Sequence, residues 1–163
     1  ASTSLLDLYG AYSLGWVTIT SNSTTYIPRY DRRHSIKALS VFHVLPGVDI
    51  TLRWDFGSGF PFTPSVGKYN RLKFPDLFDG NFAIEQGTPY LALGEKNAHR
   101  LPPYHRLDVS INYRFTVSPV TGNMGLHIIN VYDRKNIFYF YRITNQRVNT
   151  LPFFPTATLS VEF

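Results

Sequence analysis

The residues of this sequence that are best placed to do chemistry are acidic. Asp49 and Asp55 form one pair of candidates, and Asp108 and Glu162 form a second. Paired carboxylates are the groups that general acid–base catalysis uses. Arginines occur near these acids, however, and opposite charges that face one another across strands stabilise a sheet. We therefore interpret the acids as ion-paired structural residues and expect that the protein is not an enzyme; the arginines are Arg53, Arg106 and Arg114.

The histidines predict no metal site. None of them lies in a close cluster with acids or other histidines, and the chain has no cysteine for a thiolate site or a disulfide. Gly57-Ser58-Gly59 is more simply a hinge that ends a strand than a nucleophile. Neither a phosphate-binding loop nor a dinucleotide fingerprint occurs. We expect no metal and no cofactor; the histidines are His34, His43, His99, His105 and His127.

The acids belong to stretches in which apolar and polar residues alternate. Residues 48–56, 106–115 and 157–163 all follow this pattern. Side chains alternate between the two faces of a strand, so each stretch predicts a strand with one apolar and one polar face. The wall of a transmembrane β-barrel alternates in this way, and so does a soluble antiparallel sheet that covers a core. Alternation alone does not decide between these two interpretations.

In the barrel interpretation, the two faces of each strand contact different media. The apolar face lies against lipid and the polar face lines a wet lumen. The predicted lipid-facing residues are Val48, Ile50, Leu52, Trp54, Phe56, Leu107, Val109, Ile111, Tyr113 and Phe115. The predicted lumen-facing residues are Asp49, Arg53, Asp55, Asp108, Asn112 and Arg114.

Composition bears on the same choice. Aromatic residues make up 16% of the 163 residues, which suits the aromatic girdles of a membrane barrel. The net charge of +5 is spread along the chain, so we expect no nucleic-acid partner. No apolar stretch approaches the roughly 20 residues that a transmembrane helix needs. Residues 1–4 lack the charged and apolar regions of a signal peptide.

The order of strands and loops predicts an antiparallel meander. We expect about six strands, with short turns at Pro46-Gly47 and around residues 119–123, and long outer loops near 21–33 and 60–104. Prolines and aromatic residues of the second loop either bind a ligand or pack the loop against itself. The expected strands are 6–20, 34–45, 48–56, 105–115, 124–132 with a continuation at 137–141 beyond a bulge, and a last strand that ends at Phe163.

Several short motifs resemble the late barrel segment of TonB-dependent outer-membrane receptors. They are Tyr30-Asp31-Arg32-Arg33-His34-Ser35 before a strand, and the strand end Trp54-Asp55-Phe56 running into Gly57-Ser58-Gly59-Phe60-Pro61. A proline-tyrosine strand entry, Arg100-Leu101-Pro102-Pro103-Tyr104-His105-Arg106-Leu107-Asp108, and an asparagine-aromatic motif, Asn130-Val131-Tyr132-Asp133-Arg134-Lys135-Asn136, follow in the family's order. The aromatic Phe163 resembles the end recognised during barrel assembly, with Leu159 and Val161 supporting it. The motif residues are Asp31, Arg33, His34, Asn130 and Asn136.

The resemblance implies a piece of a larger receptor in the bacterial outer membrane. The family's barrel has about 22 strands and a plug, so the implied partners are the remaining strands and plug, outer-membrane lipid, the barrel-assembly machinery, and TonB through an N-terminal part that the sequence does not contain. The implied function is active uptake of a scarce nutrient, such as a siderophore, a cofactor or an oligomer. The alternative is a barrel piece that does not transport and serves as a scaffold subunit.

Overall fold

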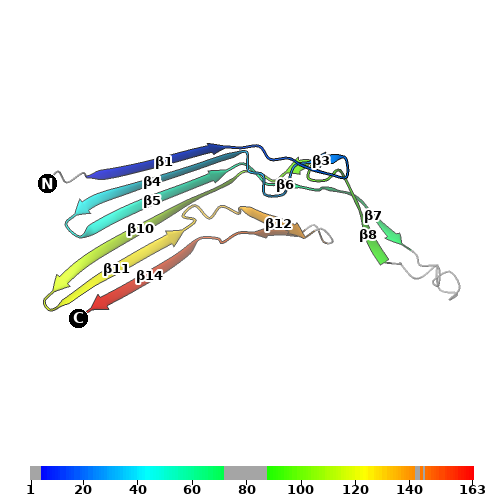
Figure 1. Cartoon of the computed structure of the whole chain (residues 1–163). Coiled ribbons are helices and arrows are strands. Elements are labelled where there is room, and N and C mark those ends of the chain that lie inside the picture. Colours follow the sequence, from blue (N-terminus) through cyan, green and yellow to red (C-terminus); the bar gives the residue numbers. More distant parts are fainter. Residues whose placement is uncertain (1–4, 72–87, 142–143, 145) are drawn as a thin grey trace.

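A single antiparallel sheet dominates the computed structural model, which describes residues 5–71, 88–141, 144 and 146–163. The prediction of an all-β antiparallel fold is confirmed for these residues. The six strands lie in the order β1-β4-β5-β10-β11-β14 (Figure 1). Their bounds are β1 Leu6–Leu14, β4 His34–Leu45, β5 Val48–Gly57, β10 Tyr104–Val117, β11 Val120–Ile129 and β14 Phe154–Glu162.

No helix that could cross a membrane occurs among the described residues.

Two short turns close one end of the sheet, which we call the turn end. Between β4 and β5, Pro46 and Gly47 turn the chain, and Gly47 has a φ of 83° as the predicted turn requires. Between β10 and β11, the turn consists of Ser118 and Pro119 alone, since Val117 pairs with Val120. The prediction that this turn extends to residue 123 is wrong, because residues 120–123 already pair within the sheet.

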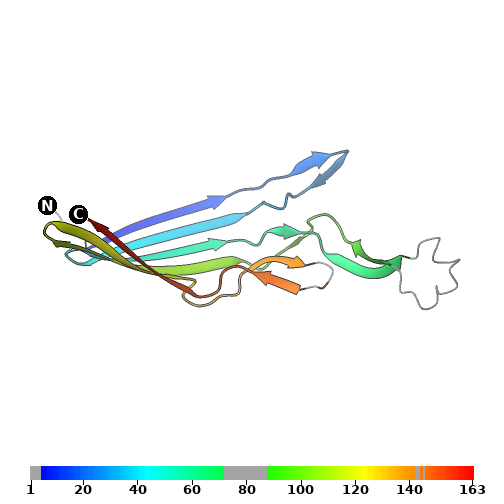
Figure 2. The same ribbon diagram turned by 90° about the horizontal axis from the view of Figure 1, so that it is seen from below.

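The opposite end, which we call the loop end, carries four small two-stranded sheets, of which three are hairpins and the fourth pairs two strands that flank one of these hairpins (Figures 1 and 2). The predicted loops near 21–33 and 60–104 therefore contain strands, although residues 72–87 of the second lie outside the described residues. The strands of these small sheets are β2 Ile19–Ser21 with β3 Thr24–Tyr26, β6 Pro61–Phe62 with β9 His99–Arg100, β7 Ser65–Arg71 with β8 Thr88–Leu93, and β12 Ile137–Tyr141 with β13 Gln146–Asn149.

Two expected strands end earlier than predicted. The strand expected over residues 6–20 stops at Leu14, before Gly15, and resumes only as β2 of a separate hairpin. The strand expected over 124–132 ends at Ile129, and residues 137–141 do not continue it across a bulge. They form β12, which pairs with β13 in a sheet of its own.

The register separates the side chains of the large sheet into two faces. Trp54 lies opposite Leu107, and Ile50 lies opposite Ile111, so the apolar positions of β5 and β10 share one face. The same register continues through Met124 opposite Leu159. The pairs place no Asp, Glu, Lys or Arg of the six described strands on this apolar face.

Nothing in the described structure covers the apolar face. None of the described hydrophobic residues is buried; the large side chains of this face are exposed, as in Leu8, Ile111 and Leu159, or half-buried, as in Leu52 and Trp54. The strands also do not close into a barrel, because β1 and β14 each have a single neighbour. The sheet is therefore a curved, open wall with a core on neither side.

Candidate functional site

The polar face of the sheet carries a chain of charged side chains across four strands. His43 of β4 contacts Asp7 of β1, with 3.1 Å between Nε2 and Oδ2, and Asp49 of β5, with 2.6 Å between Nδ1 and Oδ1. Arg114 of β10 donates to the other oxygen of Asp49 at 2.9 Å. The network links the turn-end halves of these strands.

Three of the four candidate catalytic acids, Asp49, Asp55 and Asp108, have arginine partners. Asp55 accepts a hydrogen bond from Arg53 at 2.9 Å, and Asp108 forms an ion pair with Arg106 at 2.8 Å. The register does not bring Asp108 and Glu162 together, because Glu162 lies opposite Thr121 near the turn end. Among the described residues, no three histidine or acidic side chains form a group that could hold a metal ion.

Asp31 joins the segment before β4 to the loop-end hairpins. Its side chain is 1% exposed and forms an ion pair with Arg100 of β9. The second carboxylate oxygen accepts the Val17 backbone N–H at 3.1 Å, and Arg100 also donates to the Gly59 carbonyl at 3.1 Å. Burial alone raises the pKa of Asp31, but the hydrogen bonds from Arg100 and Val17 outweigh it and lower the pKa below its ordinary value. The carboxylate therefore stays charged.

Asn130 fixes the connection that leaves β11. It is fully buried and has a φ of 56°, a conformation that asparagine tolerates better than most residues. Its side-chain amide donates to the carbonyls of Arg134 and Leu151, both at 3.0 Å, while its Oδ1 accepts the Arg134 backbone N–H at 3.0 Å. Its own N–H donates to Asp108 at 2.9 Å. This single residue thus satisfies polar groups from three segments.

Asn136 closes the same connection against β10. Its side chain is 2% exposed and imitates a neighbouring strand, since its amide donates to the His105 carbonyl at 2.8 Å and its Oδ1 accepts the His105 N–H at 3.2 Å. Arg134 adds a third contact, from its Nε to the Asn136 Oδ1 at 3.1 Å. Asn130 and Asn136 are therefore structural residues of the loop end.

The other two motif residues lie close to aromatic rings at the loop end. The Arg33 guanidinium lies 5.6 Å from the ring centre of Trp16, and His34 begins β4, where its Nδ1 lies 2.9 Å from the Tyr12 hydroxyl. A second pair of the same kind joins His105 Nδ1 and the Tyr132 hydroxyl at 2.8 Å. The ring contacts lie where the sheet meets its hairpins.

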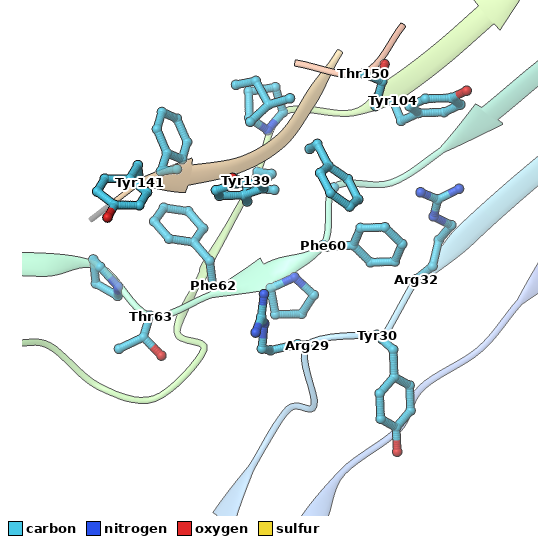
Figure 3. A pocket seen from close by; sticks show the side chains of 18 of the residues that line it. Arg29, Tyr30, Arg32, Phe60, Phe62, Thr63, Tyr104, Tyr139, Tyr141 and Thr150 are labelled. Atoms are coloured by element: carbon cyan, nitrogen blue, oxygen red, sulfur yellow. The ribbon is translucent and has the colours of Figure 1, made fainter. Parts of the chain in front are cut away.

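A hollow of about 1210 Å³ opens at the loop end, among residues 29–32, residues 59–65, and β12 (Figure 3). Eight of its 19 described lining residues are aromatic, and the Phe62 and Phe140 rings lie 6.1 Å apart between β6 and β12. The aromatic lining residues are Tyr30, Phe60, Phe62, Tyr104, Phe138, Tyr139, Phe140 and Tyr141. The lining contains two arginines, Arg29 and Arg32, and no acidic residue among those described.

Arg32 occupies the side of the hollow nearest the sheet. Its guanidinium lies 4.3 Å from the ring centre of Phe60 and 5.5 Å from that of Tyr104. Gly57 makes this position possible, because a Cβ there would lie 2.4 Å from the Arg32 Nη1. The Arg32 Nε is buried without a hydrogen-bond partner among the described residues, and burial lowers the pKa of the guanidinium from its ordinary value.

The structure also shows residues that the sequence analysis did not single out. Arg100 pairs with Asp31, and Asn97 is 5% exposed, with its amide donating to the Ile27 carbonyl at 2.7 Å. Both partners are distant in sequence, so no local spacing signals them. Of the hollow's wall, the sequence indicated the aromatic residues of the long loop, whereas β12 was interpreted as part of the sheet.

Comparison of the chain with protein-family models, curated proteins and solved structures found no match.

Proposed function

We propose that the chain forms part of the barrel wall of a TonB-dependent outer-membrane receptor that takes up a scarce nutrient. The observation that carries the proposal is the uncovered apolar face: six adjacent strands present it without Asp, Glu, Lys or Arg, while no described hydrophobic residue is buried. A soluble sheet buries such a face against a second layer. Lipid acyl chains are the surrounding that this face fits without further protein.

The strand lengths support the same proposal. A transmembrane β-strand needs about 9–11 residues when it is tilted. The strands of the sheet contain between 9 residues, in β1 and β14, and 14 residues, in β10. The hairpins all lie at one end and the short turns at the other (Figure 1), which is the asymmetry of outer-membrane barrels.

The unpaired edges define the partners that the proposal requires. Lipid cannot satisfy the backbone N–H and C=O groups of an open edge, so β1 and β14 must each pair with another strand in the membrane. We assign these positions to the remaining strands of the receptor. Leu159 and Val161 of β14 lie on the apolar face, and with Phe163 they are the residues that we propose the barrel-assembly machinery recognises.

The proposal of transport rests on the family motifs. The contacts of Asp31, Asn130 and Asn136 give those motifs a structural role at the loop end. The alternative is a barrel piece that serves as a scaffold. The test is binding of the complete gene product, purified from outer membranes, to the periplasmic domain of TonB. We expect a specific complex that a receptor-derived TonB-contacting peptide displaces. A folded outer-membrane protein that forms no such complex would favour the scaffold.

A further inference from the structure

The hollow at the loop end has walls suited to a flat ring. Phe62 and Tyr139 face it from β6 and β12, and Phe60 and Tyr104 face it from the side of the sheet (Figure 3). Phe140 of β12 also lines it, beside Phe62. Aromatic rings pack against one another in stacked or edge-to-face geometries, with centres about 4.5–7 Å apart. A volume of about 1210 Å³ admits an organic molecule and far exceeds that of an inorganic ion.

The described lining of the hollow carries positive charge only, and Asp55, the acid that acts on Arg32, lies outside that lining. Arg29 and Arg32 line it, the described lining contains no Asp or Glu, and neither arginine forms an ion pair among the described residues. Arg32 lies against two rings, which hold its planar guanidinium in place, and its buried Nε has no acceptor. A guanidinium in this state suits a carboxylate or a similar planar anion.

The remaining polar side chains of the hollow suit a neutral sugar less well than an aromatic anion. Apart from the arginines and tyrosines, the lining offers only the hydroxyls of Thr63, Ser65 and Thr150. Among the described residues, the lining has no carboxylate or amide side chain to accept the many hydroxyl protons of a saccharide. The combination of ring walls with unneutralised arginines is complementary to a ligand that has both a ring and a negative charge.

We propose that this hollow binds an organic anion that carries a flat aromatic ring. This inference rests on the proposed transport function and gives the chemical class of the molecule that the receptor takes up. The ring packs against the aromatic side chains that β6 and β12 present to the hollow, and the anionic group lies against Arg32, whose position over Gly57 places it beside Tyr104 at the end of the sheet.

The test compares two probes of the same shape. Naphthalene-2-carboxylate has the ring and the charge, and naphthalene-2-carboxamide has the ring alone. Calorimetric titration of the complete, folded gene product in detergent should give a dissociation constant about tenfold or more lower for the carboxylate, since hydrogen bonds to charged groups contribute most. Arg32→Gln should abolish this preference, Arg32→Lys should retain part of it, and Phe140→Leu should weaken both probes alike.

Arg147→Gln is the matched control, because it removes an exposed positive charge at a residue that pairs with Phe140 across the hairpin but does not itself line the hollow. An equal loss of preference in Arg147→Gln and Arg32→Gln would overturn the proposal in favour of general charge attraction. Binding of maltose and of neither naphthalene probe would overturn it in favour of a sugar site. Heat-modifiable gel mobility of each sample shows whether the protein is folded, and so separates the two proposals. A folded, inserted protein that binds neither naphthalene probe contradicts the proposed ligand class but not the proposed barrel wall.

Discussion

Ile111→Arg is expected to destabilise the membrane-inserted protein by roughly 2–4 kcal/mol, the cost of placing arginine on the lipid face near the bilayer midplane. Ile111 lies near the middle of β10 on the apolar face, opposite Ile50 of β5 and Leu126 of β11. Arginine there would have no carboxylate on its own face of the described sheet.

Asn112→Arg is the matched control one residue along the same strand. Asn112 lies on the polar face opposite Asp49, so a new guanidinium there faces a carboxylate and water. We expect a change of about 1 kcal/mol or less, as is usual for exposed ion pairs. The free energy of unfolding in lipid vesicles and the folded fraction in outer membranes measure both variants. Equal tolerance of arginine at the two positions is incompatible with a barrel wall.

Asp31→Ala is expected to lower the free energy of unfolding by about 3 kcal/mol, because removing one member of a buried ion pair leaves the other charge without its partner. The Arg100 side chain is 28% exposed, which places the effect at the lower end of the range for such pairs. The Val17 N–H loses its acceptor as well. Arg114→Gln breaks an ion pair whose arginine is 67% exposed and should change stability by less than about 1 kcal/mol.

The pH dependence of Asp31 gives a second readout of the same contact. Its pKa in the folded protein lies below the ordinary value of 3.8. The stabilisation is therefore fully present above that value and is lost as the pH falls through the lower, folded-state pKa. Wild-type protein should lose stability in this acidic range more steeply than Asp31→Ala. Parallel pH profiles, or similar losses in Asp31→Ala and Arg114→Gln at neutral pH, would contradict the buried ion pair.

The sequence predicted the large sheet well because its strands have a clear period of two. The bounds of β4 coincide with those expected, and β5 and β10 differ from the expectation by one or two residues at an end. The Pro46-Gly47 turn was predictable because proline and glycine fix its dihedrals locally. Residues with strictly alternating character leave few alternative registers, since a shift by one residue exchanges the two faces.

The loop end was less predictable, for a different physical reason. Strands of two to seven residues, such as β6 and β7, are too short to show a period. β12 is a run of apolar residues that fits the sheet in sequence but pairs with β13 in space. The contacts of Asp31 with Arg100 and of Asn97 with Ile27 depend on the tertiary fold, so neither the ion pair nor the hollow was visible in the sequence.

The most direct test of the proposal is to measure which medium each face of β10 contacts. The chain has no native cysteine, so single cysteines at residues 109–113 can each carry a spin label in the complete gene product in lipid vesicles. Apolar oxygen and a polar nickel complex then report lipid and water. We predict that positions 109, 111 and 113 favour oxygen, while 110 and 112 favour the nickel complex. Water exposure at all five positions, or protection of 109, 111 and 113 from both reagents by a protein core, would contradict a lipid-facing wall.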